Sequence, residues 1–118
     1  MSYSVSVRFM KMDKFGKAVF VADAKREPSA FDELKRLHAK LVEMKTECFL
    51  PIYATGKYAT VTGYSTAQFE EQSVYELSFD IRKVFHANGK TYINTVFKSV
   101  VLVMHSDDCL DRFEDLVL

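Results

Sequence analysis

Alternating apolar and polar positions predict a β-strand near the N-terminus. From residue 3 to residue 9 every second side chain is apolar, beginning with Tyr3 and ending with Phe9, which is the period of a half-buried strand. Residues 10–16 end in a glycine and predict a turn. The apolar run at residues 18–22 predicts a second strand, so the two segments indicate a hairpin.

Apolar residues then recur at three- and four-residue steps from residue 31 to residue 44. This spacing predicts an amphipathic helix of about four turns. Pro28 and Ser29 precede it, and Asp32 and Glu33 follow at its start. We expect Ser29 to cap the first turn and the two acids to favour the helix dipole.

The rest of the chain is rich in predicted strands. Residues 49–53 and 58–64 are short β-prone runs around a turn at Gly56, and the polar residues 65–72 predict a loop or a single helical turn. Long strand-like runs follow at residues 74–85 and 91–104.

Asn88-Gly89, between these long runs, predicts a tight hairpin turn. If Asn88 and Gly89 are the two loop residues, opposite residues have numbers that sum to 177. Phe85 then faces Tyr92, and this aromatic pair lies at the hairpin tip beside Lys83, Lys90 and Asn94. A dimer contact would explain such a pair as well as a ligand would.

Length and composition predict one domain with a distinct C-terminal end. The 118 residues include 16 basic and 16 acidic side chains. Residues 106–118 hold five acids and one arginine, which leaves a net charge of +4 on residues 1–105. We therefore expect a single strand-dominated α+β domain over 1–105, followed by an acidic tail or short helix over 106–118.

No residue pattern indicates an enzyme, a metal site or a cofactor. His38, His86 and His105 have no ligand-spaced neighbours, and the four glycines are isolated rather than gathered in a phosphate loop. Cys48 and Cys109 are 61 positions apart and predict free thiols. The remaining enzymatic alternatives are a Cys48 thiolate activated by a histidine, or an active site that no sequence motif marks. No signal or membrane span is evident, so we expect a cytoplasmic protein.

Aromatic residues beside lysines carry the main functional hypothesis. Single-strand binders combine flat rings, on which bases stack, with cations that follow the phosphates. The candidates for this role are Lys14, Phe15, Lys17, Lys57, Tyr58, Lys83, Phe85, Lys90 and Tyr92. The alternative is that the rings belong to strand cores and the lysines serve solubility.

Two early strands, a helix, two middle strands and a long late hairpin resemble an OB-type small antiparallel barrel. The helix departs from the common OB pattern, since it follows the second strand rather than the third. Residues 75–83, 85–90 and 96–103 resemble the C-terminal hairpin of filamentous-phage single-stranded DNA-binding proteins. That resemblance implies a homodimer whose aromatic loop residues stack on bases.

The acidic end is similar to the tails with which many bacterial and phage single-strand binders recruit replication partners. The residues that would contact such a partner are Asp107, Asp108, Phe113 and Leu118. The leading hypothesis is thus sequence-independent binding of single-stranded DNA, or RNA, in replication or recombination. The alternative is a protein-interaction module, an inhibitor or adaptor, that uses the late hairpin or the acidic tail.

Overall fold

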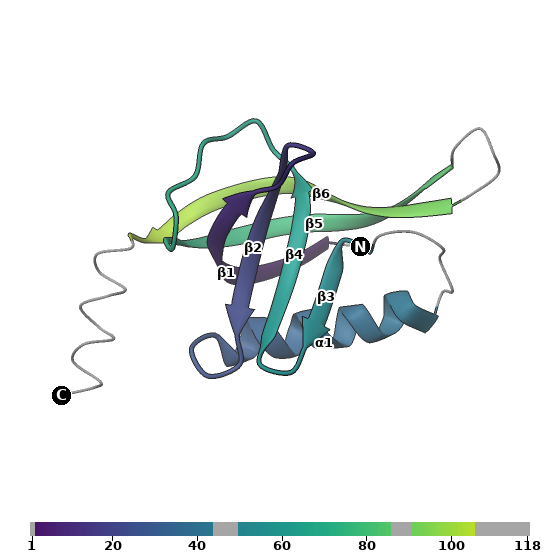
Figure 1. The fold of residues 1–118 in the computed structure, drawn as a ribbon, viewed down its shortest axis with the longest axis horizontal. Helices are drawn as coiled ribbons and strands as arrows, with labels where there is room; N and C mark the ends of the chain where they lie inside the picture. Colours follow the sequence, from purple (N-terminus) through teal and green to yellow (C-terminus); the bar gives the residue numbers. More distant parts are fainter. Residues whose placement is uncertain (1, 44–49, 86–90, 106–118) are drawn as a thin grey trace.

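Six strands and one helix make up the part of the chain that the computed structural model describes, namely residues 2–43, 50–85 and 91–105 (Figure 1). In chain order they are β1 (Ser2–Met12), β2 (Lys17–Asp23), α1 (Pro28–Glu43), β3 (Ile52–Thr55), β4 (Tyr58–Tyr64), β5 (Val74–Phe85) and β6 (Thr91–Met104). The expected α+β, strand-dominated fold class is confirmed, and so is the position of the helix after the second strand.

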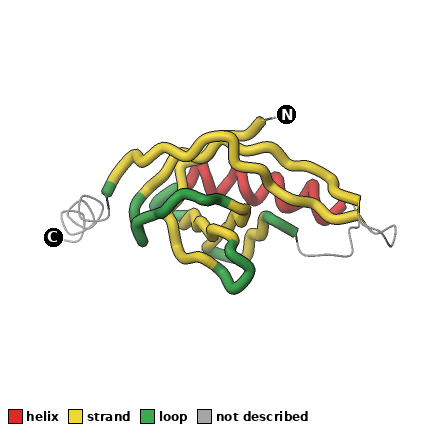
Figure 2. Tube along the Cα trace, turned by 90° about the horizontal axis from the view of Figure 1, so that it is seen from above, coloured by secondary structure: helices red, strands yellow, loops and turns green. Residues whose placement is uncertain are grey.

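The strands close into a small barrel. Its order is β2-β1-β5-β6-β4-β3, and an additional pairing of β2 with β4 joins the two sides of the sheet. β4 and β6 pair in parallel over two residues, whereas the other pairings are antiparallel. In Figure 2, β5 and β6 extend beyond the rest of the barrel in the same direction as α1.

The helix covers one end of the barrel. α1 packs against β3, β4, β1 and β2, and it crosses below β2, β4 and β3 in Figure 1. Its inward stripe is Ala30, Phe31, Leu34, Leu37 and Leu41, all buried. These side chains pack against the inward residues of the strands. The apolar residues spaced for a helix and those that alternate along the strands therefore form one hydrophobic core. The described helix is neither long nor apolar enough to cross a bilayer.

The start of α1 differs from the expected one. The helix begins at Pro28, and the carbonyl of Glu27 accepts the first helical bond, from the amide of Phe31 (2.9 Å). Proline is suited to this first position because its missing N–H would have no intrahelical partner there. Ser29 is therefore the second helical residue, and the prediction that it caps the helix is wrong.

The register of the late hairpin also differs from the expected one. Opposite residues sum to 177 from Tyr75 to Ser78, as predicted, but the sum is 176 from Phe79 onward. The shift leaves Lys98 as an extra residue in β6. Since a shift of one residue moves side chains to the other face of a strand, Ile93 and Thr95 point inward and are buried.

As a consequence, Phe85 is opposite Thr91 and Val84 is opposite Tyr92. Phe85 and Tyr92 are therefore not opposite each other, and the predicted pairing of these two residues at the tip is wrong. The predicted turn at Asn88-Gly89 lies outside the described residues. The predicted register already differs by one residue at the described pair nearest the tip, Phe85 with Thr91, and the bulge at Lys98 restores the predicted sum of 177 toward the base.

Gly63 marks the place where β4 and β6 close the barrel. Gly63 is paired with Thr95, and a Cβ atom at Gly63 would lie 2.7 Å from Thr95 Oγ1 and 2.8 Å from Phe97 Cζ. The hydroxyl of Thr95 donates to the carbonyl of Thr62 across the same junction. Glycine is thus required here by lack of space rather than by an unusual backbone angle.

We expect Gly63→Ala to destabilise the fold by about 1–3 kcal/mol, the usual cost of overpacking a close-packed site. Urea unfolding followed by circular dichroism measures this change. Repeating the substitution in a Phe97→Leu background, which removes the ring atoms nearest the new methyl group, should reduce its cost. A Gly63→Ala variant as stable as wild type would contradict the steric explanation.

Candidate nucleic-acid interface

Three tyrosines project from the outer face of β3 and β4. Tyr58 and Tyr64 alternate with buried residues along β4, and Tyr53 in β3 is opposite Thr60. Since directly opposite residues share a face, Tyr53, Tyr58 and Tyr64 lie on the same side of the sheet. All three are exposed, with 39%, 53% and 62% of their surface accessible. We call this surface the tyrosine face.

The β1–β2 turn forms one end of the tyrosine face. Asp13 Oδ1 accepts hydrogen bonds from the backbone amides of Phe15 (2.8 Å) and Lys17 (2.9 Å). Gly16 has a φ of +81°, a value that glycine adopts at no steric cost. Phe15, at the tip of this turn, is 62% exposed. Asp13 therefore shapes the turn that presents the ring.

Two lysines accompany the rings at this end. The ammonium of Lys14 lies 5.1 Å from the ring centroid of Phe15, and that of Lys17 lies 5.0 Å from the ring of Tyr64. Lys17 and Tyr64 are direct partners in the β2–β4 ladder. The structure thus brings cations and flat rings together, which is the arrangement expected for Lys14, Phe15 and Lys17.

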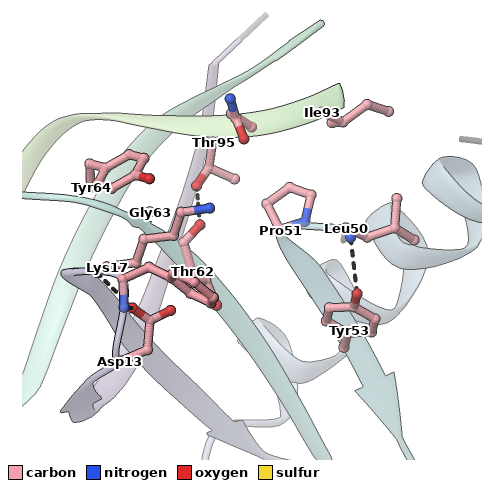
Figure 3. A pocket seen from close by; sticks show the side chains of 12 residues that line it. Asp13, Lys17, Leu50, Pro51, Tyr53, Thr62, Gly63, Tyr64, Ile93 and Thr95 are labelled. Atoms are coloured by element: carbon pink, nitrogen blue, oxygen red, sulfur yellow. Dashed lines mark hydrogen bonds between the residues drawn. The ribbon is translucent and has the colours of Figure 1, made fainter. Parts of the chain in front are cut away.

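A cavity of about 370 Å³ opens beside Tyr64 (Figure 3). Its walls come from the β1–β2 turn, from residues 50–53 and from facing parts of β4 and β6. The Tyr53 hydroxyl accepts a hydrogen bond from the backbone amide of Leu50 (2.9 Å), and this bond holds the ring at the cavity wall. Asn94 adds an amide side chain to the lining. A cavity with aromatic, apolar and hydrogen-bonding walls suits a planar polar group.

Lys57 and Tyr58 form the opposite end of the tyrosine face. Tyr58 pairs with Asp23 at the far end of the same β2–β4 ladder that pairs Lys17 with Tyr64. The six-residue separation corresponds to about 20 Å along the strand. Tyr58 therefore lies on the same face as Lys17 and Tyr64, at the other end of the ladder, and Lys57 is the exposed turn residue that precedes it.

The late hairpin contributes less than expected. Lys83 is exposed, but it lines a separate hollow against α1, together with Lys40, Leu41 and Tyr3. Tyr92 is half-buried. The structure does not describe the other predicted site residues of this region. They are the Phe85 side chain, Lys90, and the tail residues Asp107, Asp108, Phe113 and Leu118.

Sequence reasoning missed Tyr64, Tyr53 and Asp13. Tyr64 could have been found, because it has the same parity as Tyr58 in a strand of alternating pattern. Tyr53 could not, because its place beside Thr60 depends on the pairing of β3 with β4. Among the described residues, no group of three or more His, Cys, Asp or Glu side chains is placed to hold a metal ion.

One carboxylate near this region is stabilised in its charged form. Asp80 accepts a hydrogen bond from the Ser2 hydroxyl (2.8 Å), and the ammonium of Lys98 lies 3.1 Å away. These two contacts, the hydroxyl first, lower the pKa of Asp80 below its ordinary value of 3.8. Arg82 also approaches Asp80, at 3.7 Å, so two cations share one anion.

Two further pKa shifts lie away from the tyrosine face. The Ser73 hydroxyl, and after it His105, lower the pKa of Glu70 by hydrogen bonding to its carboxylate. Glu33 raises the pKa of Arg36 on the exposed surface of α1. Glu70 thereby ties the loop after β4 to the end of β6.

Comparison with protein-family models, with curated proteins and with solved structures gave no match.

Asp13→Ala should destabilise the protein by about 1–3 kcal/mol, because two backbone amides lose their acceptor. Asp13→Asn keeps an acceptor oxygen and should retain most of the stability. Thermal unfolding of both variants checks this, with near-equal losses contradicting a role for the hydrogen bonds.

Asp80→Asn should weaken the fold in a pH-dependent manner. A lowered pKa stabilises the folded state above the ordinary value of 3.8, and this stabilisation is lost as the pH falls through the lower folded-state value. The stability difference between wild type and variant should thus be largest above about pH 5 and shrink as the pH falls below 3.8. Urea midpoints measured across this range provide the test, and a constant difference would contradict it.

Proposed function

We propose that this protein binds single-stranded DNA without sequence preference, in the cytoplasm, during replication or recombination. The observation that supports this function best is the tyrosine face with its adjoining turn. It places Phe15, Tyr64, Tyr53 and Tyr58 on one exposed surface, with lysines at both ends. Stacking rings beside phosphate-neutralising cations are what strand binding requires.

The position of this face within the barrel supports the same function. β1, β2, β4, β5 and β6 form the closed ring, with β3 added beside β4. β2 and β4 are therefore the second and third barrel strands. In OB folds the face of these two strands and the loop between the first two strands bind oligonucleotides. The replication or recombination role rests on the resemblance to phage single-strand binders.

The dimensions of the face fit a short stretch of nucleic acid. The distance of about 20 Å between the ladder ends accommodates about four nucleotides, the lower end of the range for one OB-type domain. Cations at both ends imply phosphate contacts along this length. Each contact should add about −0.7 to the salt slope of binding.

Phe15→Ala and Tyr64→Ala should each weaken binding to an oligo-dT by about 5- to 150-fold, because a stacked base contributes about 1–3 kcal/mol. Fluorescence anisotropy at low and moderate salt measures the affinities. Tyr64→Phe is the matched control, since it keeps the ring and should bind nearly as well as wild type.

Val42→Ala, on the exposed surface of α1 and outside the cavity lining, should leave binding unchanged. Wild-type protein that shows no salt-sensitive binding at micromolar concentration would overturn the proposed function. An oligo-U titrated in parallel distinguishes DNA from RNA preference.

A second candidate function, protein interaction, has an observation of its own. Val101, Leu102 and Val103 form a run of exposed apolar residues at the end of β6, just before the acidic tail. Exposed apolar patches of this kind mark contacts with other chains. The run suits either the homodimer that the phage resemblance implies or a separate protein partner.

A further inference from the structure

A second hollow adjoins the tyrosine face on the other side of Tyr64. It is lined by the loop residues Ser65, Thr66 and Ala67 and by residues 97–100 of β6, with Gly16 and Tyr64 at its border. Tyr64 thus lines both this hollow and the cavity described above. Its exposed ring is a ridge between two depressions.

The floor and the rim of this second hollow have different chemistry. Phe97 is half-buried, and its ring lies 5.7 Å from that of Phe20, edge to face, so the core fixes its orientation. Ser65 and Thr66, which carry hydroxyls, and Lys98 also line the hollow. A lining that combines an aromatic residue, hydroxyl-bearing residues and a cation suits a base and its sugar.

Lys98 is a cation among the lining residues and favours an anion, whereas its charged neighbours Asp80 and Arg82 lie outside the lining. Lys98 and Arg82 both approach Asp80, at 3.1 Å and 3.7 Å. One carboxylate therefore faces two cations, and the cluster keeps a net positive charge. Lys98 itself is about half exposed, so it remains accessible to a phosphate while it is paired with Asp80.

We infer that a bound single strand continues from the tyrosine face over the ring of Tyr64 into this second hollow, with Lys98 contacting a phosphate there. The inference rests on the proposed function and extends its site. Short oligonucleotides occupy the tyrosine face, whereas longer ones use both depressions.

Thr66→Glu tests the path, because it adds a negative charge at the rim in an exposed loop position. The measurement is anisotropy with oligo-dT of about 4 and about 12 nucleotides, lengths within the range of OB-type sites. We expect at least a fivefold loss of affinity for the longer oligonucleotide and little change for the shorter one. Gln68→Glu is the matched control, since it makes the same charge change in the same loop outside the lining.

Lys98→Gln provides a second measurement. It should make the salt slope of the longer oligonucleotide less steep by about 0.7, the value of one phosphate contact, and leave that of the shorter one unchanged. Thr66→Glu behaving like Gln68→Glu at both lengths, with an unchanged slope for Lys98→Gln, would overturn the inference. The proposed function would survive that result if Tyr64→Ala still lost affinity, whereas wild type binding neither length would overturn both.

Discussion

The close approach of β4 and β6 at Gly63 determines the geometry of the rest of the barrel. The junction holds two short parallel pairs, a hydroxyl bonded to a strand carbonyl, and no space for a Cβ atom. It joins the late hairpin to the early strands and so converts an open sheet into a ring. The hydrophobic core forms inside this ring because each strand turns every second side chain inward and α1 covers one end.

The same junction positions the candidate site. Tyr64 directly follows Gly63, so the residue that closes the barrel is next to the most exposed tyrosine. With Gly63 turned inward, the alternation along β4 sends Tyr64 outward, where it meets Lys17 from β2. Both depressions have walls from β6 near this junction, since residues 93–95 line one and residues 97–100 line the other. Closure of the barrel and the candidate binding surface therefore depend on the same few residues.

The late hairpin shows how a single extra residue changes a functional interpretation. Its strands were correctly located, but the bulge at Lys98 moves the tip half of β6 by one position. Ile93 and Thr95 thereby enter the core, and the expected Phe85–Tyr92 pair is lost. The bulge also places Lys98 beside Asp80, where the ion pair favours the charged carboxylate.

The amino-acid sequence by itself determined the fold class, the helix and the approximate limits of the strands, because these depend on local periodicity and turn residues. It also identified Phe15, Lys17 and Tyr58 as exposed binding candidates, since lysines and aromatic residues adjoin in those turns. Only the tertiary structure decided that these residues share one face with Tyr53 and Tyr64, and that Lys83 is directed toward α1. Strand pairing and bulges cause this difference, because they join residues distant in sequence and leave little signal in any one segment.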